Sequence, residues 1–291
     1  MERIALFMFH KDWDVCSSRL DLLRAFNPEV QIYGLFGGEA ADFDQVNARF
    51  REQLSGIYHF RHDDSRWKWQ NTDLAVREWF CNFGRELQFQ VVHVIQWDLL
   101  LFERLARLYR RVPSGALGLT GITPVSSISH RWEWCLAEQL KAPMTQLEAH
   151  VRETYGFTGI LEASLGPGYC LPRAFLQKYA EMDIPDLGHD EVRLPLYARV
   201  LGFPIVDTGF YSRWFDAAEE QYFNANSVEI RDEVIIQELM RFRGRRVFHP
   251  YRKVVGPIAT AMLPQAVAPW HDRIRSALNN LSCALNHLIR R

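Results

Sequence analysis

Apolar residues fall in short runs that alternate along the chain with segments of helical spacing. Residues 3–10 and 30–36 are rich in apolar side chains, as is typical of strands covered on both faces in a parallel sheet. Between them, residues 14–26 carry apolar side chains at roughly helical spacing, and Asn27-Pro28 predicts the end of that helix. The strand, helix, strand order predicts a βαβ unit with a right-handed connection.

The same alternation continues through the middle of the chain. Helices are expected over residues 72–87 and 172–179, and a buried strand over residues 90–98. Residues 188–207 predict a loop, an amphipathic helix and a strand, whereas the Gly, Ser, Thr and Pro of residues 115–134 indicate loops around short strands. The pattern therefore predicts an α/β protein whose sheet is mainly parallel.

A second unit is expected at the end of the chain. We divide the sequence into one large domain, residues 1–255, and a C-terminal helical extension, residues 256–291. Residues 270–291 have leucines at helical spacing and arginines at both ends, which predicts an amphipathic helix. That helix would pack on its own domain or on a second subunit, and a basic amphipathic end could instead rest on an anionic membrane surface.

Charge and cysteine usage exclude several classes of protein. The 291 residues include 34 Lys and Arg against 35 Asp and Glu, and a net charge of -1 provides no broad basic field for nonspecific binding of nucleic acid. The five cysteines are far apart and form no C-x-x-C pair, which favours reduced thiols in a cytoplasmic protein. The first apolar run is too short to span a bilayer and is followed by no signal-cleavage site.

Polar residues at the ends of the predicted strands are the candidate site, because ligands of such sheets bind at the carboxyl ends of strands. Asp98 closes a buried strand, where it could hold a cation or a sugar hydroxyl, or only cap a following helix. Asp190 and Glu191 open a helix and could simply favour its dipole. His249, between an apolar strand and a proline, is either a ligand or a satisfied surface group.

These motifs occur in the order found in GT-A glycosyltransferases, which use nucleotide-diphosphate sugars as donors. Gln96-Trp97-Asp98 resembles the Asp-x-Asp motif of that family, with Gln96 in place of the first Asp. His189-Asp190-Glu191 is similar to the acidic pair that opens a helix in the family, and His249 stands where a late metal-binding His is expected. The resemblance extends over approximately residues 3–255.

The resemblance implies a GT-A-like, Rossmann-type mixed sheet, mainly parallel and flanked by helices, in an enzyme that transfers sugars. A divalent metal, Mn²⁺ or Mg²⁺, would be held by Asp98 and His249 and would offset the charge that develops on the diphosphate leaving group. Asp190 is the first candidate, and Glu191 the second, for the carboxylate that takes the proton of the acceptor hydroxyl. A base opposite the leaving group predicts inversion at the anomeric carbon.

The donor is expected to be a UDP-sugar, the most frequent donor of the family, and the acceptor a sugar, lipid-linked molecule or protein. Donor contacts are expected at the first strand ends and between the second strand and Asp98, from Phe9, His10, Gly38, Lys68, Asp73, Arg77 and Trp97. Four tryptophans could stack on sugar rings or pack in the core, and they are Trp67, Trp69, Trp132 and Trp134. Tyr169, beside Gly168, is a further candidate for the acceptor site.

Two other functions stay open at this point. A catalytically inactive relative would bind the donor without turnover, and Gln96 favours that reading because an amide supplies no anionic charge. Another α/β nucleotide-using enzyme, such as a nucleotidyltransferase, would need a Gly-rich phosphate loop in the first strand-to-helix turn. Neither G-x-G-x-x-G nor G-x-x-x-x-G-K-[ST] occurs there.

Overall fold

The computed structural model describes residues 2–62, 64–225 and 228–255, so the predicted extension over residues 256–291 lies outside the described residues. The described residues form a mixed, seven-stranded sheet in the order β3-β2-β1-β4-β7-β6-β8. Its strands are β1 Arg3–Phe9, β2 Gln31–Phe36, β3 Ile57–His59, β4 Val91–Gln96, β6 Leu117–Pro124, β7 Glu162–Pro172 and β8 Ile205–Asp207. Neighbouring strands pair in parallel except that β7 runs antiparallel to both β4 and β6. The expected α/β fold with a mainly parallel sheet flanked by helices is confirmed.

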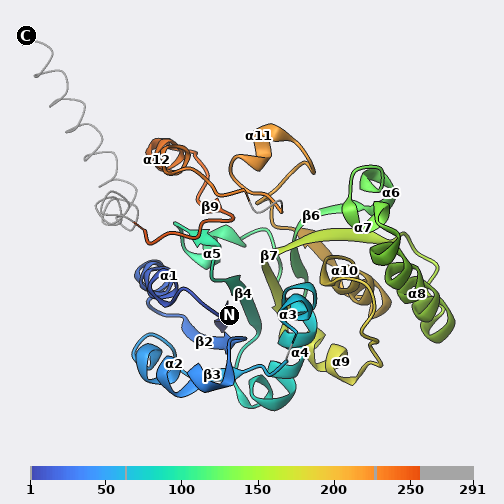
Figure 1. Cartoon of the computed structure of the whole chain (residues 1–291), viewed down its shortest axis with the longest axis horizontal. Helices are drawn as coiled ribbons and strands as arrows, with labels where there is room; N and C mark the ends of the chain where they lie inside the picture. The colour runs from blue at the N-terminus through green and yellow to red at the C-terminus, as the bar shows by residue number, and fades with distance from the viewer. Residues whose placement is uncertain (1, 63, 226–227, 256–291) are drawn as a thin grey trace, which may run out of the picture.

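Helices cover both faces of this sheet (Figure 1). The larger ones are α1 Trp13–Phe26, α2 Phe43–Phe50, α4 Thr72–Asn82, α8 Glu138–Tyr155, α9 Arg173–Glu181 and α10 Asp190–Val200. Alternate residues of β1 show how the faces are filled, because Ile4 and Leu6 pack with residues of α4, α9 and α10, whereas Ala5 and Phe7 pack with residues of α1 and α2. Each fully buried Leu, Ile or Phe contributes about 1.5–3 kcal/mol, which is why the continuous apolar run specifies a central strand.

A second, two-stranded sheet of β5 Leu100–Leu101 and β9 Val247–Phe248 joins distant parts of the chain. It packs with α1 and with α12 Asp232–Met240. The alternative in which Asp98 only caps a following helix is therefore wrong, since β5 follows and α5 begins only at Leu105. Asp98 is no helix cap, and its carbonyl instead accepts a hydrogen bond from the Tyr251 N–H at 2.8 Å.

The glycine-rich segments also differ from their prediction. Residues 117–124 form the continuous strand β6 rather than loops around short strands, and Gly166-Pro167-Gly168 lies inside β7. At Gly118, an added Cβ would lie 2.7 Å from the Cys170 sulfur, so the glycine allows the two strands to approach closely. The remaining short helices are η1 Ala40–Asp42, α3 Ser65–Gln70, η2 Gly84–Glu86, α5 Leu105–Leu108, α6 Val125–Ile128, α7 Glu133–Leu136 and α11 Ala217–Glu220.

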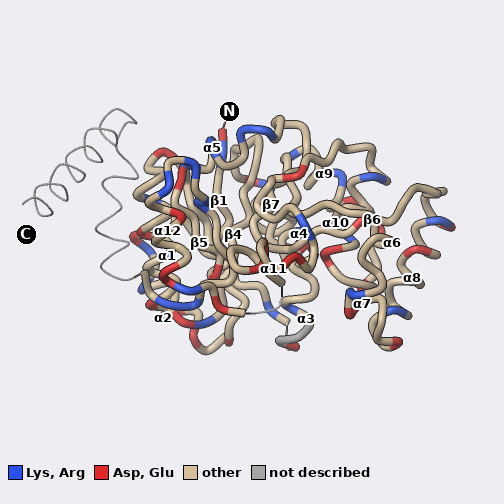
Figure 2. Tube along the Cα trace, turned by 90° about the horizontal axis from the view of Figure 1, so that it is seen from above, with Lys and Arg blue, Asp and Glu red and all other residues tan. Residues whose placement is uncertain are grey.

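Basic and acidic residues are interspersed over the molecule rather than gathered on one side (Figure 2). This distribution agrees with the net charge of -1. Within the described ranges, no helix has the length and apolar character that crossing a membrane requires.

Candidate functional site

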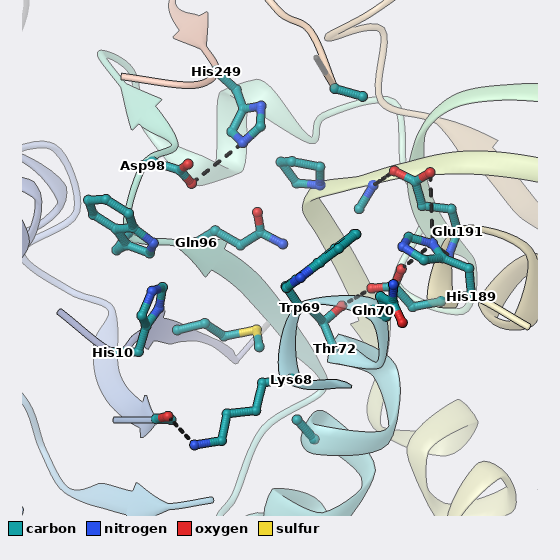
Figure 3. Close-up of a pocket in the computed structure, with 18 of the residues that line it drawn as sticks. His10, Lys68, Trp69, Gln70, Thr72, Gln96, Asp98, His189, Glu191 and His249 are labelled. Atoms are coloured by element: carbon teal, nitrogen blue, oxygen red, sulfur yellow. Dashed lines mark hydrogen bonds and ion pairs between the residues drawn. The ribbon is translucent and has the colours of Figure 1, made fainter. Parts of the chain in front are cut away.

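A cavity of about 1170 Å³ opens at the carboxyl ends of β1, β2 and β4. Of the eleven residues predicted as bases, donor contacts or metal ligands, nine line it. Those that do are Phe9, His10, Gly38, Lys68, Trp97, Asp98, Asp190, Glu191 and His249. The fold therefore brings together, from β1 to β9, side chains that the sequence places far apart (Figure 3).

At one end of the cavity, His249 and Asp98 face each other (Figure 3). The Nε2 atom of His249 lies 3.5 Å from the Oδ1 atom of Asp98. The Nδ1 atom lies 2.9 Å from the carbonyl oxygen of Asn224, and because a carbonyl only accepts, Nδ1 carries a hydrogen. Nε2 therefore faces the Asp98 carboxylate, either as an N–H donor to it or, without a hydrogen, as the nitrogen that a metal would bind.

The charge of Asp98 is stabilised by its neighbours. Burial acts to raise its pKa, but His249 and Arg252 outweigh that effect and hold the pKa below its ordinary value. The Nε atom of Arg252 lies 3.3 Å from the second carboxylate oxygen. Asp98 is thus an anion at neutral pH, fixed at the lip of the sheet.

A carboxylate and an imidazole are suitable ligands for a divalent cation. No group of three or more His, Cys, Asp or Glu side chains that could hold a metal occurs in the part of the chain that the structure describes. Asp98 and His249 could supply two ligands, and a cation bound there would need its remaining ligands from water or from a substrate. Gln96, whose amide also points into the cavity (Figure 3), adds no negative charge.

The strand ends of β1 and β2 form the adjoining wall. The His10 ring meets Trp97 edge-on, with centroids 5.7 Å apart, and the pKa of His10 is lowered by burial and by Lys11. The Lys68 ammonium donates a hydrogen bond to the Gly37 carbonyl at 2.7 Å. Its two other N–H donors remain for an anionic ligand.

At the other end of the cavity, α10 begins with two buried acids. The Asp190 Oδ2 atom accepts a hydrogen bond from the Thr72 hydroxyl, and the Glu191 Oε1 atom accepts one from the Gly166 N–H at 3.2 Å. Burial raises the pKa of Glu191 to about 7. That value lies near the pH at which a general base is most effective.

His189 caps this helix and contacts both acids. Its Nδ1 atom accepts from the Glu191 N–H at 3.2 Å and lies 2.9 Å from the Asp190 Oδ1 atom. Although burial opposes it, the charge of these carboxylates raises the pKa of His189. A role for His189 was not expected from the sequence, although its position directly before the acidic pair was the available signal.

Asp73 and Arg77 do not line the cavity, which corrects the expectation that they contact the donor. The Asp73 carboxylate forms a fully buried ion pair with Arg193 at 2.6 Å. The Arg77 guanidinium donates to the carbonyl oxygens of Ala180 and Met182. Both side chains connect α4 to later parts of the chain instead of facing a ligand.

Some of the aromatic candidates line the cavity and others do not. Trp69, Trp132 and Trp134 line the cavity. Trp67 instead stacks on the rings of the Phe60 and His62 side chains, and Tyr169 is buried in the core. Thr72 and Gly166, which hold the two acids, carried no recognisable signal of that role in the sequence.

Comparison with known proteins gives structural matches only. No family model matches the chain, and no curated protein matches its sequence. Mouse xyloside xylosyltransferase 1 in its apo form is 12% identical over 72% of this chain and 86% of its own, with a TM-score of 0.36. The galactosyltransferase LgtC, in complex with donor and acceptor sugar analogs, is 13% identical over 62% of this chain and 60% of its own, with a TM-score of 0.36.

The apo-form glycosyltransferase GlyE of Streptococcus pneumoniae is 12% identical over 71% of this chain and 45% of its own, with a TM-score of 0.33. These similar structures are glycosyltransferases. The present chain spans 60% of the length of LgtC and 45% of that of GlyE.

Proposed function

We propose that this protein is a glycosyltransferase that moves a sugar from a nucleotide-diphosphate donor to an acceptor hydroxyl. One observation carries the proposal. A single cavity is lined at one end by a carboxylate beside an imidazole, Asp98 and His249, and at the other by a buried acid with a pKa of about 7, Glu191. Sugar transfer from a nucleotide donor needs both, because charge develops on the leaving diphosphate while the acceptor hydroxyl loses a proton.

The donor is placed at the carboxyl ends of β1 and β2. Its nucleoside would lie against Phe9, His10 and Gly38, and its diphosphate between Lys68 and Asp98. A divalent cation, Mn²⁺ or Mg²⁺, held by Asp98 and His249 would supply positive charge to the leaving group. We propose a UDP-sugar as the donor, because the order of the motifs resembles that of GT-A glycosyltransferases and UDP-sugars are the most frequent donors of that family.

We prefer Glu191 to Asp190 as the base. Asp190 accepts a hydrogen bond from Thr72 through Oδ2, and its Oδ1 lies 2.9 Å from the His189 Nδ1 atom but has no hydrogen-bond partner among the described residues. Glu191 accepts from the Gly166 N–H through Oε1, and its Oε2 lies 3.8 Å from the nearest His189 nitrogen. The pKa of Glu191, raised to about 7, supports it as the base, the reverse of the order expected from the sequence.

The reaction is a direct displacement. Glu191 takes the proton of the acceptor hydroxyl while that oxygen bonds to the anomeric carbon, and the bond from this carbon to the diphosphate oxygen breaks with its electron pair. Attack opposite the leaving group inverts the anomeric carbon. Proton NMR of donor and product gives the two configurations, and retention would contradict this mechanism.

Thermal unfolding with a panel of UDP-, GDP-, CMP- and dTDP-sugars, with and without Mn²⁺ or Mg²⁺, tests the function. A ligand at 100 times its dissociation constant adds about 2.7 kcal/mol of stability, so one nucleotide should raise Tm in a metal-dependent way. Asp98→Asn should abolish that shift, whereas Glu191→Gln should keep it and lose turnover. Exposed Asp14 provides the control variant Asp14→Asn, and no shift with any donor would overturn the proposal.

An inactive donor-binding relative is the second candidate. Gln96 favours it, because its amide lines the cavity where a second carboxylate would strengthen cation binding. This candidate shares the nucleotide-dependent Tm shift but predicts no product with any acceptor. It also predicts that Glu191→Gln changes nothing but stability.

A further inference from the structure

Three aromatic rings meet at the acid end of the cavity. They belong to Trp69 of α3, Trp134 of α7 and His189 at the start of α10, and all three residues line the cavity. The ring centroids of Trp134 and His189 are 4.0 Å apart, those of Trp69 and His189 5.8 Å, and those of Trp69 and Trp134 6.3 Å. We call these three residues the aromatic wall.

Two features of the aromatic wall are not explained by folding. The Trp69 side chain is 56% exposed, although burying an indole is among the most favourable contributions to stability. The Nε2 atom of His189 is buried and makes no hydrogen bond within the described residues, and such an atom carries a cost of about 1–3 kcal/mol. A ligand that covers the Trp69 indole and forms a hydrogen bond with His189 Nε2 would bury the apolar ring and satisfy the unpaired nitrogen.

We propose that the aromatic wall binds the acceptor, and that the acceptor presents a neutral pyranose there. This inference rests on the proposed function and adds its acceptor class. The ring of the sugar would stack on the exposed indole of Trp69, while one of its hydroxyls exchanges a hydrogen bond with His189 Nε2. Figure 3 shows Trp69 standing beside His189 and Glu191, so a sugar bound there lies next to the base.

The surroundings of His189 favour a hydroxyl as the partner of Nε2. Its Nδ1 atom is approached both by the Glu191 N–H and by the Asp190 carboxylate, so Nε2 is a donor in one protonation state and an acceptor in another. A hydroxyl satisfies either state because it both donates and accepts. A carboxylate or phosphate at the same place would approach two buried acids and be repelled.

The capping role of His189 permits a sharp substitution. His189→Asn keeps an acceptor at the position of Nδ1, and Asn is a favoured capping residue, but it removes the nitrogen that would contact the sugar. Trp69→Ala removes the stacking surface. Trp67→Phe is the matched control, because Trp67 lies on the same helix but does not line the cavity.

Saturation-transfer difference NMR with the methyl β-pyranosides of glucose, galactose, mannose and N-acetylglucosamine tests the proposal on the full chain. The wild type and Trp67→Phe should transfer saturation to the ring protons of at least one pyranoside. His189→Asn should weaken its binding about tenfold, and Trp69→Ala should abolish it. Each variant is checked by its Tm and by its Tm shift with UDP and Mn²⁺, which reports the opposite end of the cavity.

The two proposals fail in different ways. A wild type that shifts with UDP and Mn²⁺ but binds no pyranoside, or binds it equally in all variants, overturns the acceptor site and leaves the donor site standing. A wild type that binds a pyranoside through Trp69 and His189 but shifts with no nucleotide overturns the transferase and keeps the sugar-binding wall.

Discussion

The Nε2 atom of His249 lies 3.5 Å from the Oδ1 atom of Asp98, although one residue follows β9 and the other follows β4. The pairing of β5 with β9 creates this proximity, because it lays the segment after Asp98 alongside the segment before His249. A simple ion pair and a cation site with two protein ligands are both compatible with the distance. They differ in what removal of the imidazole does.

His249→Ala should weaken the response to metal. If the imidazole is a ligand, the Mn²⁺ concentration that gives half of the UDP-dependent Tm shift should rise about tenfold or more, since ligand-shell changes cost this much in affinity. His130→Ala is the control, because His130 is exposed and does not line the cavity. An unchanged Mn²⁺ titration with a lowered Tm would identify a plain ion pair instead.

Glu191 should make both activity and stability depend on pH near 7. Activity should rise with pH as the carboxyl of pKa about 7 loses its proton, and this step should be absent in Glu191→Gln. Because His189 and Asp190 are in contact with Glu191, the measured value belongs to the whole cluster. A kcat/KM profile that is flat from pH 5.5 to 8.5 would rule out this base.

The raised pKa of Glu191 also determines how the stability of the fold changes with pH. The folded protein holds the Glu191 proton more tightly than the unfolded chain, so this contribution to stability is complete below the ordinary pKa of 4.5 and is lost as pH rises through about 7. The raised pKa of His189 acts in the same direction. Urea denaturation should therefore find Glu191→Gln more stable than wild type at pH 8 but not at pH 4.5.

The pairing of Asp73 with Arg193 should be structural. Both side chains are fully buried, and Asp73→Asn would leave a buried guanidinium without its counter-charge, at a cost of about 3–5 kcal/mol. Glu148→Gln, which breaks the exposed pair with Arg152, should cost less than about 1 kcal/mol. Equal losses in urea denaturation would show that Asp73 does not hold α4 to α10.

Gly38 should tolerate no side chain. A Cβ added there would lie 2.3 Å from the Phe36 ring and 2.8 Å from the His10 carbonyl oxygen, so Gly38→Ala should cost about 1–3 kcal/mol through overpacking. Gly115→Ala is the matched control, because nothing lies within 4 Å of its added Cβ. Circular dichroism melts of both variants measure the difference, and equal Tm values would contradict the contact.

Apolar runs and helical spacing predicted the strands and helices whose formation depends on nearby residues. The apolar run of β1, the helical spacing of α1 and the helix and strand within residues 188–207 all appear where the sequence indicated. The leucines after Asp98 carried no prediction of a strand, yet they form β5 and pair with β9, far along the chain. Such pairing is set by tertiary contacts that no short window contains.

The residues of the site likewise differ in whether their role follows from local sequence or from tertiary contacts. Asp98, Asp190, Glu191 and His249 could be found because each stands at the junction of a strand or helix with a loop. Asp73 has a similar position at the start of α4, but its carboxylate forms an ion pair with Arg193 of α10 and does not face the cavity. The roles of Thr72 and Gly166 depend on which residues face them in space, and spacing along the sequence holds no such information.

Strand β7 connects the two ends of the cavity. It runs antiparallel to β4 and extends beyond it, so that Gly166 donates its N–H to Glu191 while its missing Cβ would lie 3.8 Å from the Gln96 amide nitrogen. The distance between the Gln96 and Glu191 sides of the cavity is thus set by one hydrogen-bonded ladder, as a span of fixed length. If the proposed function holds, substrates of different size would have to be accommodated by exchanging side chains such as Trp69, while the strands that carry the site stay in place.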